Sequence, residues 1–155
     1  MAWVLPLPLV VPLLAAALIA GGDHFLPSPL QDAIGIAAAG TATAFALVAM
    51  VASQSAETLH WFGGWQPREG VVVGVAFTAD PLGAGMAALC CGLGMLALIF
   101  SVTYLKEPAR LYNSMILVFC GAMAAFSLSG DLFNIFVWFE LMGVAAYALA
   151  GYKVE

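Results

Sequence analysis

Residues 130–153 read GDLFNIFVWFELMGVAAYALAGYK. About 20 apolar residues are what an α-helix needs to cross roughly 30 Å of hydrocarbon, and this stretch meets that length. One acidic side chain, Glu140, lies near its middle. The stretch therefore predicts a membrane-spanning helix over residues 132–151 that carries a carboxyl group where water is scarce.

The whole chain has the composition of a membrane protein. Of its 155 residues, 64% are hydrophobic and 8% are charged, whereas an average soluble domain is about 25% charged. The mean hydropathy is +1.04. Four Lys and Arg residues are too few for a nucleic-acid surface. These values exclude the soluble classes and predict an integral membrane protein.

Four more apolar runs are long enough to span a bilayer. Continuous apolar runs favour helices, because barrel strands are shorter and alternate in polarity. We predict an all-α, polytopic transmembrane bundle of about five helices, with an irregular start where Pro6, Pro8 and Pro12 occur. No Lys or Arg precedes Arg68, so we expect the first run to be retained rather than cleaved as a signal peptide. The four runs cover residues 3–20, 33–52, 82–104 and 111–128.

A more polar stretch divides the chain into three parts. Residues 1–52 are expected to form the first two transmembrane helices, and residues 82–155 the third to fifth. Residues 53–81 are expected to form an extramembrane loop. Within that loop, apolar residues alternate in the manner of a strand, which predicts a short β-strand or hairpin. The alternating residues are Val71, Val73, Val75 and Phe77.

Two aspartates mark helix starts. Asp80 precedes Pro81, and Asp131 follows Gly130 in a tight connection. An aspartate before a helix accepts a hydrogen bond from a free backbone N–H, and proline fits the first turn. We therefore interpret both aspartates as helix caps rather than as proton carriers.

The cysteines and histidines do not form a recognisable site. Cys90, Cys91 and Cys120 lie inside apolar runs and match neither a metal spacing nor a disulfide framework, so we interpret them as packing thiols. His24 and His60 fall in predicted loops, where solvated side chains are expected. The sequence predicts no metal site.

Loop charges predict the orientation of the chain. With the N-terminus outside, Lys106, Arg110 and Lys153 lie on the inner side, and only Arg68 lies on the outer side. Lys and Arg are in excess in cytoplasmic loops. We therefore predict an N-terminus outside and a C-terminus inside, in a bacterial or archaeal cytoplasmic membrane.

Glu140 is the candidate functional residue. It lies nine residues beyond Asp131, or about 13 Å along the helix and close to the bilayer midplane. A charge there costs about 2.5–3.5 kcal/mol, so such residues usually face a bundle interior or a water-filled cavity and have a function. No Lys, Arg or His occurs in the five spans. Burial without a cation favours the protonated acid, which suits a group that takes and releases protons.

Residues 130–149 resemble the fifth-helix signature of the proton-translocating, antiporter-like membrane subunits. These occur in respiratory complex I, in Mrp cation/proton antiporters and in membrane-bound hydrogenases. The resemblance covers about Gly70 to Glu155, including A-D-x-L at residues 79–82, and the first two helices fit by position only. The family pattern is approximately G-D-L-F-N-L-F-V-F-F-E, and it is matched by Gly130, Asp131, Leu132, Phe133, Asn134, Phe136, Val137, Phe139 and Glu140.

The resemblance implies that Glu140 is a proton relay and that residues 82–155 begin the proton-translocating domain. In the family, the matching glutamate pairs with a lysine on a later, broken helix. This chain ends at Glu155 before such a helix, and Lys153 is expected at the inner membrane edge. We therefore expect either an incomplete reading of a longer subunit or one half of a split subunit.

The resemblance also implies partners. These are the lipid bilayer, other membrane subunits of a larger complex, and protons, with Na⁺ left open. No Fe–S, haem or flavin ligand set is visible, so no cofactor is predicted, and any enzyme activity belongs to an NADH:quinone oxidoreductase-like or cation/proton antiporter complex. The alternative is a small structural membrane subunit in which Glu140 is only a helix-packing hydrogen-bond residue.

Overall fold

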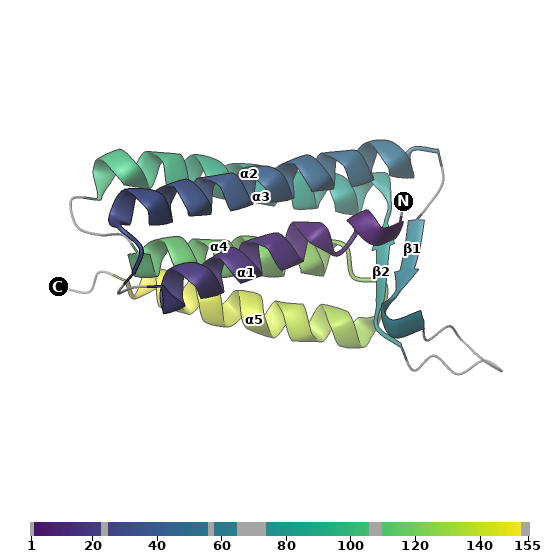
Figure 1. Cartoon of the computed structure of the whole chain (residues 1–155). Coiled ribbons are helices and arrows are strands. Elements are labelled where there is room, and N and C mark those ends of the chain that lie inside the picture. Colours follow the sequence, from purple (N-terminus) through teal and green to yellow (C-terminus); the bar gives the residue numbers. More distant parts are fainter. Residues whose placement is uncertain (1, 23–24, 56–57, 65–73, 106–109, 153–155) are drawn as a thin grey trace.

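The computed structural model describes residues 2–22, 25–55, 58–64, 74–105 and 110–152. Over these residues it shows a bundle of five α-helices with a two-stranded sheet at one end (Figure 1). The predicted all-α bundle, with a small β element between its second and third helices, is confirmed. The elements are η1 Ala2–Val4, α1 Leu7–Gly21, α2 Ser28–Ser53, β1 Thr58–Trp61, η2 Phe62–Gly64, β2 Ala76–Ala79, α3 Pro81–Tyr104, α4 Arg110–Ser127 and α5 Leu132–Ala150.

Prolines set the starts of the first two helices. The short 3₁₀ turn η1 precedes α1, which begins at Leu7 and so has the irregular start that was predicted. The helix α2 begins at Ser28, earlier than the predicted residue 33, because Pro29 fits a first helical turn that needs no N–H bond there. Length and composition suit α2, α3 and α5 for crossing a membrane. The other two helices are apolar but shorter over their described residues, Leu7–Gly21 of α1 and Leu111–Ser127 of α4.

Small side chains allow the helices to approach closely. Ala42 and Ala46 of α2 share one buried cluster with Ala84 and Ala87 of α3. Helix α1 packs against α4, and α4 packs against α5. Figure 1 shows α5 along the opposite edge of the bundle from α2 and α3. Among the described elements, α4 is the one with which α5 makes an extensive contact, so α5 is the least enclosed helix.

The sheet is attached to the end of the bundle at which α5 begins. Strands β1 and β2 are antiparallel, with His60 opposite Phe77. The other edge of β2 bonds to the connection between α4 and α5, where the Thr78 N–H donates to the Leu128 carbonyl at 2.8 Å. Of the residues predicted to alternate in a strand, Phe77 lies in β2. Val71 and Val73 lie outside the described residues.

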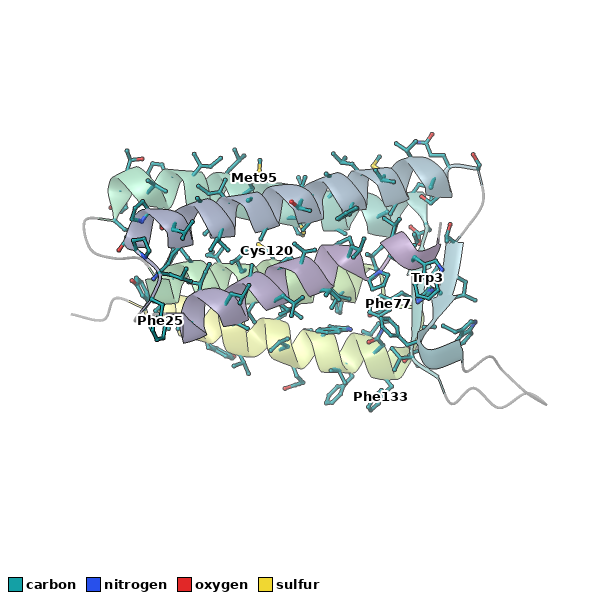
Figure 2. The ribbon with its side chains drawn as sticks, in the orientation of Figure 1. Trp3, Phe25, Phe77, Met95, Cys120 and Phe133 are labelled. Carbon is teal, nitrogen blue, oxygen red and sulfur yellow. The ribbon has the colours of Figure 1, made fainter. Side chains whose placement is uncertain are left out.

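His60 lies in β1 rather than in a solvated loop. Its ring stands between Trp3 and Phe62, with centroid distances of 5.6 Å and 5.4 Å. Phe62 in turn contacts the buried Phe77 at 5.3 Å. Figure 2 shows Trp3 and Phe77 beside the sheet. This aromatic row joins the N-terminal turn to both strands. The other histidine, His24, lies outside the described residues.

The predicted orientation stays a prediction. Arg68, Lys106 and Lys153 lie outside the described residues, and the side chain of Arg110 is not described.

The two predicted caps are confirmed. The Gly83 N–H donates to Asp80 Oδ1 at 2.6 Å, and the Asn134 N–H donates to Asp131 Oδ1 at 2.7 Å.

Replacing Gly94 should loosen the contact between α3 and α4. A Cβ added at Gly94 would overlap Cys120 Sγ, while Cys120 Cβ would stay 3.6 Å away. We expect Gly94→Ala to lower the free energy of unfolding by about 1–3 kcal/mol, the usual cost of overpacking. The double variant Gly94→Ala/Cys120→Ala should recover most of this loss, as measured by thermal unfolding in detergent. Equal losses in the single and double variants would contradict this packing.

Candidate functional site

Helix α5 has a buried stripe and an exposed face. Asn134 and Ala145 are buried against the bundle, and Trp138 packs on the core cluster from the same side. The opposite face is apolar and exposed along most of the helix, and Phe133, on this face, points away from the bundle (Figure 2). The large exposed apolar side chains of α5 are Leu132, Phe133, Phe136, Val137, Phe139, Val144 and Tyr147.

Glu140 lies in the middle of the exposed face. Its side chain is exposed, and the hydrogen bonds recorded among the described residues include none to its carboxyl group. A carboxyl group at this depth is predicted to face a bundle interior or a water-filled cavity. Within the described chain it instead points outward, because the buried stripe of α5 is on the other side of the helix.

The start of α5 is bound to the sheet through one carboxylate. Asp131 Oδ1 accepts the cap hydrogen bond from the Asn134 N–H at 2.7 Å, and Asp131 Oδ2 accepts from the Ala76 N–H at 2.9 Å. The cap was predicted from the sequence. The second bond was missed, because it joins residues 55 positions apart. Asp131 thus holds both the first turn of α5 and the start of β2.

The Asn134 side chain makes a second link between the same two elements. Its Nδ2 donates to the Ala76 carbonyl at 3.2 Å, and its Oδ1 accepts from Trp138 Nε1 at 2.6 Å. The Gly130 N–H donates to the same carbonyl at 2.8 Å. A Cβ at Gly130 would lie 2.8 Å from Thr78 Oγ1 and 3.2 Å from the Ala76 carbonyl oxygen, so a larger residue here would have to displace β2. Gly130, Asp131 and Asn134 of the G-D-L-F-N pattern therefore connect β2 to the start of α5 by hydrogen bonds.

A further polar pair connects α2 and α4 at the other end of the bundle. Asn113 Nδ2 donates to Asp32 Oδ1 at 2.6 Å, and Asn113 is almost completely buried. The sequence analysis did not single out either residue. No local pattern joins them, because they are 81 positions apart.

The three cysteines lie where α3 meets α4. Cys91 and Cys120 are buried, Cys90 is half-buried, and all three are free thiols. Among the described residues, no group of three or more His, Cys, Asp or Glu side chains is placed to hold a metal ion.

Comparison with known proteins identifies several relatives. A family model described as NADH-ubiquinone oxidoreductase (complex I), chain 5 N-terminus, matches residues 65–113. The NADH-quinone oxidoreductase subunit N of Desulforudis audaxviator is 32% identical over 123 aligned positions, which cover 72% of this chain and 24% of that protein. A Na⁺/H⁺ antiporter subunit of Bacillus subtilis is 31% identical over 160 aligned positions, 96% of this chain and 30% of the relative.

A solved structure shows the same arrangement. A chain in the Mrp complex from Dietzia sp. superposes with a TM-score of 0.80 at 28% identity, over 94% of this chain and 26% of that one. This chain thus spans about a quarter to a third of the length of these three proteins. The likeness also includes α1 and α2, which the sequence analysis had placed by position only.

Removing Asp131 should destabilise the chain more than removing Asp80. Asp131→Ala loses a cap and the bond to Ala76, whereas Asp80→Ala loses one cap bond. A lost cap costs about 0.5–2 kcal/mol, and a lost hydrogen bond to a charged group about 1.5–3 kcal/mol. We expect the larger fall in thermal unfolding temperature for Asp131→Ala. A larger fall for the Asp80 control would show that the bond to the sheet contributes little.

Proposed function

This chain belongs to the antiporter-like membrane subunit family, and we propose that it forms the N-terminal part of a proton-conducting subunit in which Glu140 is a proton relay. The parent assembly would be of the complex I, Mrp antiporter or membrane-bound hydrogenase type. The relatives named above, an NADH-quinone oxidoreductase subunit and a Na⁺/H⁺ antiporter subunit, support this class.

The position of Glu140 on α5 carries the proposal. An ionised carboxyl group on an apolar face at mid-membrane depth costs about 2.5–3.5 kcal/mol or more. The bundle described here does not offset that cost, because Glu140 is exposed on the side of α5 away from α4. We therefore propose that another transmembrane segment covers this face and supplies a hydrogen-bond donor or a cation to Glu140.

A covered carboxyl group can relay protons. Burial in a low-dielectric site favours its neutral form, and a nearby positive charge favours its ionised form. If the covering segment carries a lysine that moves toward or away from Glu140, the proton affinity of Glu140 changes with that movement. A redox step or a cation flux elsewhere in the complex would then drive proton uptake and release. In this proposal Glu140 relays protons. Na⁺ stays open as a second ion that the whole complex would exchange for protons.

The exposed face of α5 supports the proposed partners. It carries an aromatic and aliphatic row that fits lipid or a neighbouring helix, and its one carboxyl group favours a helix with a complementary polar group. Other membrane subunits are the proposed neighbours in the complex. The N-terminus is proposed to lie outside and the C-terminus inside, which places the sheet and the start of α5 at the outer surface.

Glu140→Gln tests the proposal directly. In membranes that contain the complete complex, we expect proton translocation to fall about 10²-fold or more, since positioned acid–base groups contribute about 10²–10⁴-fold. The complex should still assemble, because glutamine keeps the size and polarity of the side chain. The measurement is quenching of a ΔpH-sensitive dye in inverted vesicles, with assembly checked by native gel electrophoresis.

Glu140→Asp is the matched control. It keeps the carboxyl group and should retain more transport than the glutamine variant. If Glu140 is only a packing residue, which is the structural alternative, Glu140→Gln will either prevent assembly or leave transport near its normal rate. Either result would contradict the proton relay.

A further inference from the structure

We propose that Asn134 is a positioning residue: with Asp131 it links the backbone of Ala76 to Trp138 and so sets the rotation of α5 that directs Glu140 out of the bundle. This inference rests on the proposed function of Glu140. It concerns residues on the opposite side of α5 from the carboxyl group, and it assigns a role to the part of the G-D-L-F-N pattern that carries no protons.

The backbone of Ala76 is held at both its N–H and its carbonyl. Its N–H donates to Asp131 Oδ2, and its carbonyl accepts from the Gly130 N–H and from Asn134 Nδ2. All of these partners belong to the first turn of α5 or to the two residues before it. The β2 strand therefore fixes the position of the helix start at three hydrogen bonds.

Trp138 extends this link by one helical turn. Residues 134 and 138 lie on one face, and Trp138 Nε1 donates to Asn134 Oδ1 at 2.6 Å. The Trp138 ring packs against the buried cluster that includes Phe77 and Leu128. Hydrogen bonds to the sheet and an aromatic anchor in the core thus act on the same side of α5.

This link determines where Glu140 points. Each residue turns an α-helix by about 100°, so Glu140 lies about 200° from Trp138, on the opposite face. Among the described elements, α5 packs extensively against α4 alone, and a helix with one neighbour has little else to oppose rotation about its axis. The link through Asn134 provides the second point of attachment. A rotation of α5 would move Glu140 away from the segment proposed to cover it.

The geometry can be tested on the full chain in lipid nanodiscs. A spin label would be attached at Val144, which is 64% exposed on the Glu140 face, in a background carrying Cys90→Ala. We expect Asn134→Leu, which keeps the size of the side chain but no hydrogen bond, to reduce the oxygen accessibility of this label at least twofold. A label at Leu96 of α3, 57% exposed, is the control and should not change.

Asn134→Asp is the conservative variant. It keeps an oxygen that accepts from Trp138 Nε1 but loses the Nδ2 donor to the Ala76 carbonyl, so the label at Val144 should become less accessible, as in Asn134→Leu. Trp138→Phe should resemble Asn134→Leu, and the double variant should be no worse than either alone, because the two side chains act as one unit. An unchanged label at Val144 in Asn134→Leu would overturn the inference, as would additive effects in the double variant.

The effect of Asn134 on proton translocation is measured in the complete complex. We expect Asn134→Leu to lower proton translocation roughly tenfold or more and to displace its pH profile, since a misplacement of about 1 Å can cost up to about 10²-fold. A normal rate and pH profile, in a complex where Glu140→Gln abolishes transport, would overturn the positioning role. If Glu140→Gln itself leaves transport unchanged, the proposed function fails, and the label at Val144 alone then supports or overturns the link.

Discussion

The hydrocarbon interior of a membrane offers no hydrogen-bond partners, so every backbone N–H and carbonyl that crosses it must be paired within the protein. Helices meet this requirement along their length but leave unpaired groups at their ends. The described chain satisfies these groups with aspartate caps at the starts of α3 and α5. It places its strands at the end of the bundle, where β2 uses one edge for β1 and the other for the connection before α5.

The two faces of α5 have different roles. The buried face attaches the helix to the rest of the protein, and the exposed face carries the proposed functional residue. Its buried stripe contains Asn134, which joins it to the sheet and has hydrogen-bond partners at both its side-chain nitrogen and its side-chain oxygen. Its exposed face contains one carboxyl group among aromatic and aliphatic side chains. The same short pattern therefore specifies how the helix is held and which group it presents. Within this pattern, only Glu140 is proposed to carry the proton.

Apolar runs of membrane length predicted the helices, because hydrophobicity in lipid is a local property that composition reveals. Asp80 and Asp131 were predicted as caps for the same reason: a cap bonds within its own first turn. Strand β1 was not predicted, since four residues carry little signal until β2 pairs with them. That Glu140 lies on the exposed face of the described bundle also could not be predicted. Which face of α5 is buried depends on Ala76 and α4, which are distant in sequence, and hydrophobicity is similar all round this helix.

The pair Asp32–Asn113 has a consequence for biosynthesis. The two residues are 81 positions apart, so a ribosome working at about 5–20 residues per second needs roughly 4–16 s after Asp32 to reach Asn113. Helix α2 is complete well before then, and during that interval the Asp32 carboxyl group lacks the amide that it binds in the finished bundle. Burying an unpaired carboxyl group is costly. The end of α2 that carries Asp32 is therefore expected to stay near water until α4 has been made. The order in which the helices settle in the bilayer is in this way tied to the order in which they are made.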